Sequence, residues 1–217
     1  MLTACVGTRD SVDGEADGHD WPVFRGCASL CGYTDCAVTD APALLWSVTR
    51  QTRTVASPIV YDGVVYTLSR KGELRGYTLQ GDSCYGYDMG TAVEASFVAM
   101  DSTLYIGRID GSVTALSLRQ PGTGETMAPL WEYETLGQIS GSPNVVNDQL
   151  LEGSYDGNMY TLDRKTGRKT GQFHTGYYIN GTAAVWKGYM IFGGCDRWVR
   201  VVDVSTGMMT DSLELDT

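Results

Sequence analysis

Four stretches of the chain share one pattern of hydrophobic and polar positions. They begin at Thr54, Val93, Ile139 and Ile179 and align with one another without a gap. Within each stretch, short runs with apolar residues at alternate positions are separated by turn-forming residues such as Asp-Gly. Alternation with a period of two is typical of β-strands, and Asp-Gly between two such runs is typical of hairpin turns. The pattern therefore predicts a repeated unit of short antiparallel strands.

Three positions recur at the same place in each unit. A small residue followed by a hydroxyl residue comes near the start, at Ala56-Ser57, Ala95-Ser96, Gly141-Ser142 and Gly181-Thr182. A first turn comes five residues after the hydroxyl, at Asp62-Gly63, Asp101-Ser102, Lys187-Gly188 and, one place late, Asp148. A second turn comes fifteen residues after the hydroxyl, at Gly72, Gly111, Gly157 and, as an exception to glycine, Arg197.

A further strand is predicted before each hydroxyl. It carries an aromatic residue eleven positions upstream of the hydroxyl at Trp46, Tyr85 and Trp131, and more loosely at Phe173. With this strand, each unit of roughly 40 residues has about four strands, as a blade of a β-propeller does. A β-sandwich with accidental similarity would not keep so many positions in register four times. The sequence therefore predicts an all-β fold, a partial or open β-propeller with about four four-stranded blades.

Composition agrees with this fold and disfavours some classes of partner. Of 217 residues, 27 are glycine and 13 are tyrosine, and only 19% are charged, as in turn-rich β proteins. The formal net charge of −10 disfavours nucleic acid, whose phosphates need a basic face, and electrostatic docking on anionic lipid. No run of the sequence approaches the roughly 18 apolar residues of a membrane-spanning helix.

The first residues predict attachment to a membrane through lipid. Leu2-Thr3-Ala4-Cys5 resembles a bacterial lipobox, in which a signal peptidase cuts before a cysteine that then becomes lipid-modified. The stretch that follows is polar, acidic and contains glycine, which is typical of a disordered tether. We therefore predict lipidation of Cys5 and export to the bacterial envelope, in the periplasm or at the outer membrane or cell surface.

The chain is accordingly divided into three parts. Residues 1–19 are the lipobox and tether, residues 20–43 are an entry segment, and residues 44–217 form about four blades. The first blade strand is expected near Ala43–Val48. The closing sequence DSLELDT is expected to start a fifth blade.

Several motifs resemble those of pyrroloquinoline-quinone-like propeller repeat proteins. The resemblance rests on the segment Asp20-Trp21-Pro22-Val23-Phe24-Arg25-Gly26, on Leu44-Leu45-Trp46, and on the blade endings 162–167 and 202–207. It covers roughly residues 20–217. That group includes quinoprotein alcohol dehydrogenases and non-enzymatic lipoproteins of the outer-membrane β-barrel assembly machine.

The resemblance implies aromatic residues that dock between neighbouring blades, here at Trp46, Tyr85, Trp131 and Phe173. It also implies seven or eight blades, whereas this chain supplies about four. Either the chain is part of a longer protein or two copies complete a ring. Either would cover the sheet edges and apolar blade faces that an open half-propeller leaves exposed. We favour the first alternative.

The quinoprotein branch implies a vicinal Cys-Cys disulfide, a stacked Trp, a carboxylate-rich calcium site and an Asp base. No Cys-Cys pair exists in this chain. Trp186 and Trp198 are expected to pack in blade cores, and the repeated Asp110, Asp156 and Asp196 are expected to form turns. We therefore predict no catalytic, cofactor-binding or metal-binding residue and no cofactor. The loop at residues 118–129, which departs from the blade spacing, is the candidate contact element.

Six cysteines are present: Cys5, Cys27, Cys31, Cys36, Cys84 and Cys195. The Cys27, Cys31 and Cys36 spacing lacks the C-x₂-C geometry of a zinc knuckle, and His19 lies in the polar tether. A disulfide among these three cysteines, or one that ties them to Cys84 or Cys195, is the preferred interpretation.

The leading functional hypothesis is a non-catalytic envelope lipoprotein that acts as a protein-interaction scaffold or ligand-binding surface. Other envelope proteins are the expected partners, with self-association as a further possibility, and the membrane is contacted only through lipid on Cys5. The alternative is a quinone- or metal-dependent dehydrogenase whose site is completed by blades outside this sequence.

Overall fold

The computed structural model describes residues 20–34, 40–119 and 128–216. In these ranges the chain forms sixteen strands and no helix. Consecutive strands pair in antiparallel fashion to make four separate four-stranded sheets. The first two sheets consist of β1 (Ile59–Tyr61), β2 (Val64–Leu68), β3 (Glu73–Thr78) and β4 (Ser83–Asp88), then β5 (Phe97–Met100), β6 (Thr103–Gly107), β7 (Ser112–Ser117) and β8 (Pro129–Glu134). The last two consist of β9 (Asn144–Val146), β10 (Gln149–Gly153), β11 (Asn158–Asp163) and β12 (Lys169–His174), then β13 (Ala184–Trp186), β14 (Tyr189–Gly193), β15 (Trp198–Asp203) and β16 (Met209–Glu214).

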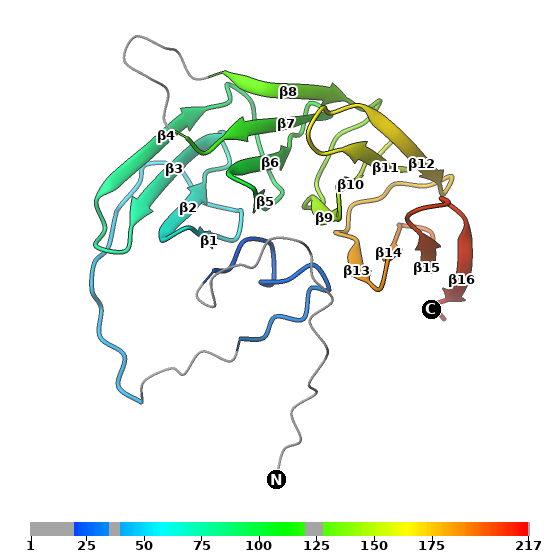
Figure 1. Cartoon of the computed structure of the whole chain (residues 1–217), viewed down its shortest axis with the longest axis horizontal. Coiled ribbons are helices and arrows are strands. Elements are labelled where there is room, and N and C mark those ends of the chain that lie inside the picture. The colour runs from blue at the N-terminus through cyan, green and yellow to red at the C-terminus, as the bar shows by residue number, and fades with distance from the viewer. Residues whose placement is uncertain (1–19, 35–39, 120–127, 217) are drawn as a thin grey trace.

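The four sheets stand side by side in an open arc (Figure 1). The first strand of each sheet lies toward the inside of the arc and the fourth strand toward the outside (Figure 1). This arrangement confirms the prediction of a partial all-β propeller with four four-stranded blades.

Hairpin turns join the strands where the repeat predicts them. The turn between the first two strands has positive φ at both Asp62 (49°) and Gly63 (70°), and again at Asp101 (49°) and Ser102 (56°). Two adjacent residues with positive φ are the mark of a type I′ turn, whose twist matches that of the flanking strands. The turn between the second and third strands has one positive φ, and Arg197 (68°) takes it where the other units have glycine.

The hydrophobic core lies between neighbouring sheets. Three clusters of buried side chains fill the three gaps, and residues adjacent in one strand go to different clusters. In β10, for example, Leu150 packs toward the second sheet and Leu151 toward the fourth. Because successive side chains of a strand point to opposite faces, an inner sheet has two buried faces. This explains why strands of the middle units are almost continuously apolar.

The repeated hydroxyl residues connect the units to one another. The backbone N–H of Ser57 donates to Ser96 Oγ at 2.7 Å, and the N–H of Ser96 donates to Ser142 Oγ at 3.0 Å. The N–H of Ser142 then donates to Thr182 Oγ1 at 2.9 Å. We call this series of bonds the hydroxyl ladder. Each rung links the same position of two adjacent units, so the ladder sets how one sheet follows the next.

The boundaries of the units differ from the sequence interpretation by one strand. The strand that carries the aromatic residue was expected to open each unit, but it is the fourth and outermost strand of the preceding sheet. The reason is hairpin closure: β3 and β4 are joined by the short turn at residues 79–82, whereas the connection from β4 to β5 is longer. A repeated sequence does not show at which strand a sheet begins. Pairing across the short turn decides which strands share a sheet.

The same shift corrects the two ends of the repeat. Residues 211–214 of the closing DSLELDT belong to β16, the outer strand of the fourth sheet, and do not start a fifth blade. At the other end, residues 43–48 were expected to form the first blade strand but form no strand. This segment resembles an outer strand, and no sheet within the described ranges precedes the first one for it to join.

The hydroxyl ladder generates a first prediction. Replacing Ser142 by Ala removes the acceptor of the buried Ser96 N–H. A buried donor left without a partner costs about 1–3 kcal/mol, so we expect the free energy of unfolding to fall by that amount in urea denaturation.

The matched control is Ser57→Ala. Ser57 supplies its N–H to the ladder, but among the described residues no ladder bond reaches its hydroxyl. This variant should therefore change the free energy of unfolding much less. Equal losses for the two variants would show that the ladder bond does not stabilise the arc.

Candidate functional site

Residues 20–34 run along the inner side of the arc (Figure 1). Trp21 forms a two-way backbone bridge with Val60 of β1, with N to O distances of 2.8 and 3.0 Å. The next residue, Pro22, accepts a hydrogen bond from the N–H of Ala99 in β5 at 2.8 Å. Val23 is buried in the cluster between the second and third sheets. The start of this segment is therefore bound to the first two sheets and packs against the third.

The same segment reaches the third and fourth sheets through one carbonyl. Ala28 O accepts the N–H of Val185 in β13 at 2.8 Å and the side-chain amide of Asn144 in β9 at 2.7 Å. The Asn144 amide also donates to Ala183 O at 2.8 Å. We call residues 20–34 the inner strap, because they bond to the innermost strand of all four sheets.

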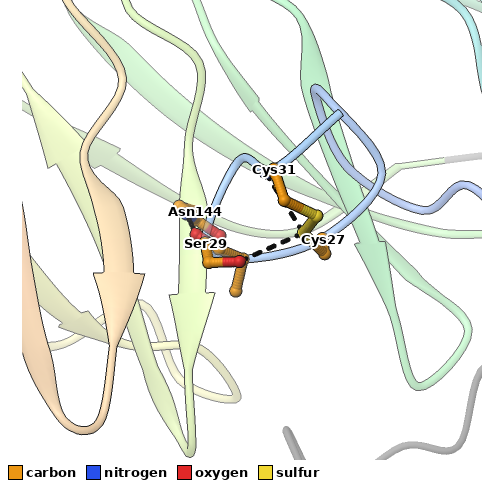
Figure 2. The surroundings of a disulfide bond; sticks show 5 residues. Cys27, Ser29, Cys31 and Asn144 are labelled. Atoms are coloured by element: carbon orange, nitrogen blue, oxygen red, sulfur yellow. Dashed lines mark hydrogen bonds between the residues drawn. A yellow bond between two sulfur atoms is a disulfide. The ribbon is translucent and has the colours of Figure 1, made fainter. Parts of the chain in front are cut away.

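A disulfide closes a short loop in the inner strap, between Cys27 and Cys31 (Figure 2). The loop brackets Ala28, whose carbonyl holds the third and fourth sheets. Of the pairings that the sequence left open, the structure shows the local one, between Cys27 and Cys31. Cys36 lies outside the described residues, and Cys84 and Cys195 are exposed on other sheets.

The disulfide generates a second prediction. When the denatured chain is treated with N-ethylmaleimide and mapped by mass spectrometry, Cys27 and Cys31 should stay unmodified until a reductant is added. Cys195, which is exposed, should react before reduction and serve as the internal control. By the loop-closure model, a five-residue loop contributes about 2 kcal/mol, so reduction should lower the free energy of unfolding by about that amount. Labelling of Cys27 without reductant would contradict the pairing.

The predicted docking aromatics lie between consecutive units. Three of them donate to a backbone carbonyl of the next unit, at the last residue of its third strand or just after it, where the turn to the fourth strand begins. The hydrogen bonds are Trp46 Nε1 to Leu79 O at 2.9 Å, Tyr85 OH to Ser117 O at 2.7 Å, and Trp131 Nε1 to Arg164 O at 3.0 Å. The indole rings also cover a glycine of that turn. A Cβ built on Gly81 would meet Trp46 at 2.8 Å, and one on Gly167 would meet Trp131 at 2.6 Å.

Phe173 contacts the next sheet in a different way. Its ring lies 5.9 Å from that of Phe192 in β14, edge to face. Strand register shows that the docking position pairs with Gly76 in the first sheet and Ala115 in the second. In the third sheet the same position is Gly171, opposite Thr161, so Phe173 lies two residues farther along the strand. The third sheet therefore has no aromatic residue at the docking position.

The three repeated aspartates each bind groups of their own turn. Asp110 Oδ1 accepts the N–H of Ser112 at 3.0 Å, and Asp196 Oδ1 accepts the N–H of Trp198 at 3.2 Å. The hydrogen-bonded Arg200 guanidinium lowers the pKa of Asp196. This is the turn role that the sequence predicts.

Asp156, the third of them, accepts the N–H of Asn158 at 2.9 Å and the hydroxyl of Tyr160 at 2.7 Å. Burial alone would raise the pKa of Asp156, but these hydrogen bonds lower it. Among the described residues no group of three His, Cys, Asp or Glu side chains is placed to hold a metal ion.

The two tryptophans of the fourth unit differ from each other. Trp198 is half-buried, whereas Trp186 is 56% exposed and has Lys187 Nζ 4.5 Å from its ring centroid. The expectation that Trp186 packs in a blade core is therefore wrong. The physical reason is its place at the end of β13, in the fourth sheet, which no other sheet of the described ranges covers on that side.

Glu152 in β10 is a feature that the sequence analysis missed. Its side chain is fully buried between the second and third sheets, and no described side chain forms a hydrogen bond with either carboxyl oxygen. A Cβ built on Gly107 would meet Glu152 Oε2 at 2.8 Å, so the carboxyl rests against that glycine. Burial raises the pKa of Glu152 well above its usual range. The aligned positions in the second and fourth units hold Ile106 and Phe192, and this contrast is the signal that was available.

Glu152 generates a third prediction. Because its pKa is raised in the folded state, the folded chain keeps a proton that the unfolded chain loses. Stability contributed by this group is therefore present at low pH and falls as pH rises above the ordinary value of 4.5. Glu152→Gln cannot ionise, so its free energy of unfolding should exceed that of the wild type by a margin that grows with pH.

Urea denaturation from pH 4 to pH 8 measures this margin. Glu134→Gln, which changes an exposed carboxylate of β8, is the matched control and should follow the wild type. If the Glu152→Gln and wild-type curves stayed parallel at every pH, the raised pKa of Glu152 would be disproved.

Two small surface features complete the candidate region. An open hollow over β4 is lined by Arg75 and residues 83–88. The Arg75 guanidinium there donates to the carbonyls of Leu74 and Tyr87, at 2.6 and 3.1 Å, which uses donors that a ligand would need. The one described histidine, His174, is 3.1 Å from Asn158 Oδ1 through its Nδ1 atom.

Some predicted features lie outside the described residues. These are the lipidation site Cys5, the tether with His19, and most of the candidate contact loop at residues 118–129. Within the described ranges, no helix has the length and apolar character needed to cross a membrane.

Comparison with known proteins gives one curated relative. No family model matches the chain. Outer membrane protein assembly factor BamB of Shewanella oneidensis is 23% identical in an alignment of 228 positions. The alignment covers 80% of this chain. The chain spans 57% of the length of that relative.

Solved structures agree on the fold. BamB from Moraxella catarrhalis superposes with a TM-score of 0.60 and 19% identity, over 71% of this chain and 50% of that one. Quinohemoprotein alcohol dehydrogenase from Comamonas testosteroni has a TM-score of 0.75 and 15% identity, over 90% of this chain and 41% of that one. The computationally designed Ika4 protein has a TM-score of 0.64 and 16% identity, over 76% of this chain and 99% of that one. The resemblance to pyrroloquinoline-quinone-like propeller proteins, predicted from Asp20–Gly26 and the repeat, is confirmed.

Proposed function

We propose that this chain is a non-catalytic protein of the bacterial envelope that binds other envelope proteins through its propeller surface. A lipid on Cys5 anchors it to the membrane, and residues 1–19 tether the propeller to that anchor. The carrying observation is the similarity to an outer membrane protein assembly factor over 80% of this chain. A scaffold needs surfaces for partners and no reaction centre, and the described residues offer such surfaces.

The fourth sheet carries exposed apolar side chains. Trp186, Met208 and Leu213 are 56%, 67% and 62% exposed. Exposed apolar side chains on one sheet favour contact with another protein. The outer strand β16 also has a free edge, at which a partner strand can add by β-augmentation.

A quinoprotein dehydrogenase is not favoured by the residues present. A vicinal disulfide is absent from the sequence, and Asp110, Asp156 and Asp196 each bind groups of separate turns. The donor set that would hold quinone and calcium therefore does not match. We propose no cofactor for this chain.

A ring made of two copies is also disfavoured. It would place the fourth sheet of one copy against the first sheet of the other, with β16 in the outer-strand position before the first sheet. Residues 44–54 already lie there, held by Trp46 to Leu79 O at 2.9 Å and by Arg50 to Glu73 at 3.0 Å. A second copy would have to displace this segment, so we propose different proteins as partners.

The anchor is tested by Cys5→Ser in the producing bacterium, with the full gene at its own locus. We expect the wild-type protein in the membrane fraction, released by detergent and not by high salt. The variant lacks the sulfur that carries lipid, so it should move to the soluble envelope fraction.

The control is Cys195→Ser, which removes an exposed thiol and should leave the distribution unchanged. A wild-type protein found in the cytosol would refute the proposed function.

Reconstitution with pyrroloquinoline quinone and calcium should give no alcohol-dependent dye reduction, and a clear rate would establish the enzyme alternative instead.

A further inference from the structure

The docking position between units is filled by an aromatic residue three times in a row. Trp46, Tyr85 and Trp131 each donate a polar hydrogen to a carbonyl of the next unit. The rings of Trp46 and Trp131 then lie against a glycine of the turn that joins the third and fourth strands. Such a contact combines apolar burial with one directed hydrogen bond, which is why Trp and Tyr suit it.

The fourth unit has the same receiving turn. Gly207 N–H donates to Asp203 O at 2.8 Å, as Gly167 N–H donates to Asp163 O at 2.8 Å. The two glycines have φ of 68° and 71°. Asp203 Oδ1 accepts the following backbone N–H groups, as Asp163 Oδ1 does. Val204 O therefore corresponds to Arg164 O, the carbonyl that receives Trp131.

Among the described residues, no aromatic side chain covers the receiving turn of the fourth unit. The residue that corresponds to Trp131 is Gly171. A Cβ built on Gly167 meets the Trp131 ring at 2.6 Å, whereas one built on Gly207 meets no atom within 4 Å. Within the described residues, none donates a hydrogen bond to Val204 O. The turn at residues 203–207 thus offers an open glycine face and an available carbonyl.

The sequence of the third sheet explains this difference. In the second sheet the small residue Ala115 lies opposite Trp131, which leaves room for the indole. In the third sheet the two sizes are exchanged, with Thr161 opposite Gly171. A Cβ on Gly171 would meet Thr161 Oγ1 at 2.8 Å. A ring at position 171 would therefore need a change at Thr161.

We propose that Val204 O and the face of Gly207 form a docking site for a tryptophan side chain of a partner protein. The indole enters over Gly171, donates its N–H to Val204 O, and covers Gly207 as Trp131 covers Gly167. The occupant is inferred from the chain itself, because the equivalent sites carry Trp46, Tyr85 and Trp131. This inference rests on the proposed scaffold function and names the contact point.

The surroundings of the site agree with an apolar occupant. Val202, next to the turn, is fully buried in the cluster between the third and fourth sheets. Met208, which follows Gly207, is 67% exposed, and Met209 is 49% exposed. Methionine side chains adapt to the shape of a bound group and favour aromatic contacts. Burial of a tryptophan at such a point is typical of the residues that contribute most to an interface.

The test uses the purified chain and N-acetyl-tryptophanamide as the probe, followed by backbone amide NMR. We expect saturable shifts of the amides of residues 203–208 at millimolar probe. N-acetyl-alaninamide is the control and should shift none of them. N-acetyl-phenylalaninamide, which has a ring but no indole N–H, should bind more weakly.

The matched variant is Thr161→Ala with Gly171→Trp, which restores the Ala115 and Trp131 pair of the second sheet. Its own indole should fill the site, abolish the probe-dependent shifts, and raise the unfolding midpoint above that of Thr161→Ala alone. If this variant does not fold, Gly207→Asn serves instead, because Asn tolerates positive φ and places a side chain on the open face. It should also abolish the shifts.

Three outcomes would overturn the proposal. They are the absence of shifts at residues 203–208, shifts that persist in the filled variant, and concentration-dependent shifts without probe, which would mean that a second copy occupies the site. The measurement does not depend on the membrane anchor. Failure of Cys5-dependent localisation would therefore refute the proposed function while leaving this site, and loss of the shifts would refute this site alone.

Discussion

The packing of one four-stranded sheet on the next is the interaction on which every other feature of this chain depends. A single sheet has an apolar face on each side and cannot bury both by itself. The three clusters between sheets bury these faces, and the hydroxyl ladder fixes the offset from one sheet to the next through Ser96, Ser142 and Thr182. The docking aromatics and the inner strap act on the same gaps, from the outside and the inside of the arc.

This dependence explains why the two ends of the arc behave differently. At the first sheet, residues 44–54 run alongside β3 and cover it. Trp46 lies near Tyr77, Arg50 is bonded to Glu73, and Thr54 forms a bridge with Ser69. At the fourth sheet, the residues that would face a further unit stay accessible, and Trp186 and Leu213 are more than half exposed. Within the described residues, the first sheet is therefore covered by residues 44–54, whereas Trp186 and Leu213 of the fourth sheet remain exposed.

Much of the fold could be predicted from local signals. The period of two, the Asp-Gly turns at Asp62-Gly63 and the glycines with positive φ at the second turn depend on neighbours in sequence, so the strands and their turns were predictable. The phase of the repeat was not, because a repeat looks the same from any starting point and hairpin closure between β3 and β4 decides which strand belongs to which sheet. Glu152 differs in the sequence from Ile106 and Phe192 at the aligned positions, but its full burial follows only when two sheets close over it.

The sequence by itself determined the four-fold repeat, the all-β propeller architecture and the aromatic positions Trp46, Tyr85 and Trp131, because each rests on spacing within one chain. Only the tertiary structure decided that the repeated hydroxyls bond to one another, since the partners are about forty residues apart. It also decided that the inner strap crosses all four sheets, and that Gly171, not Phe173, holds the docking position of the third sheet. The physical reason is that a strand's pattern shows which residues alternate, whereas register and sheet-on-sheet packing determine what each of them meets.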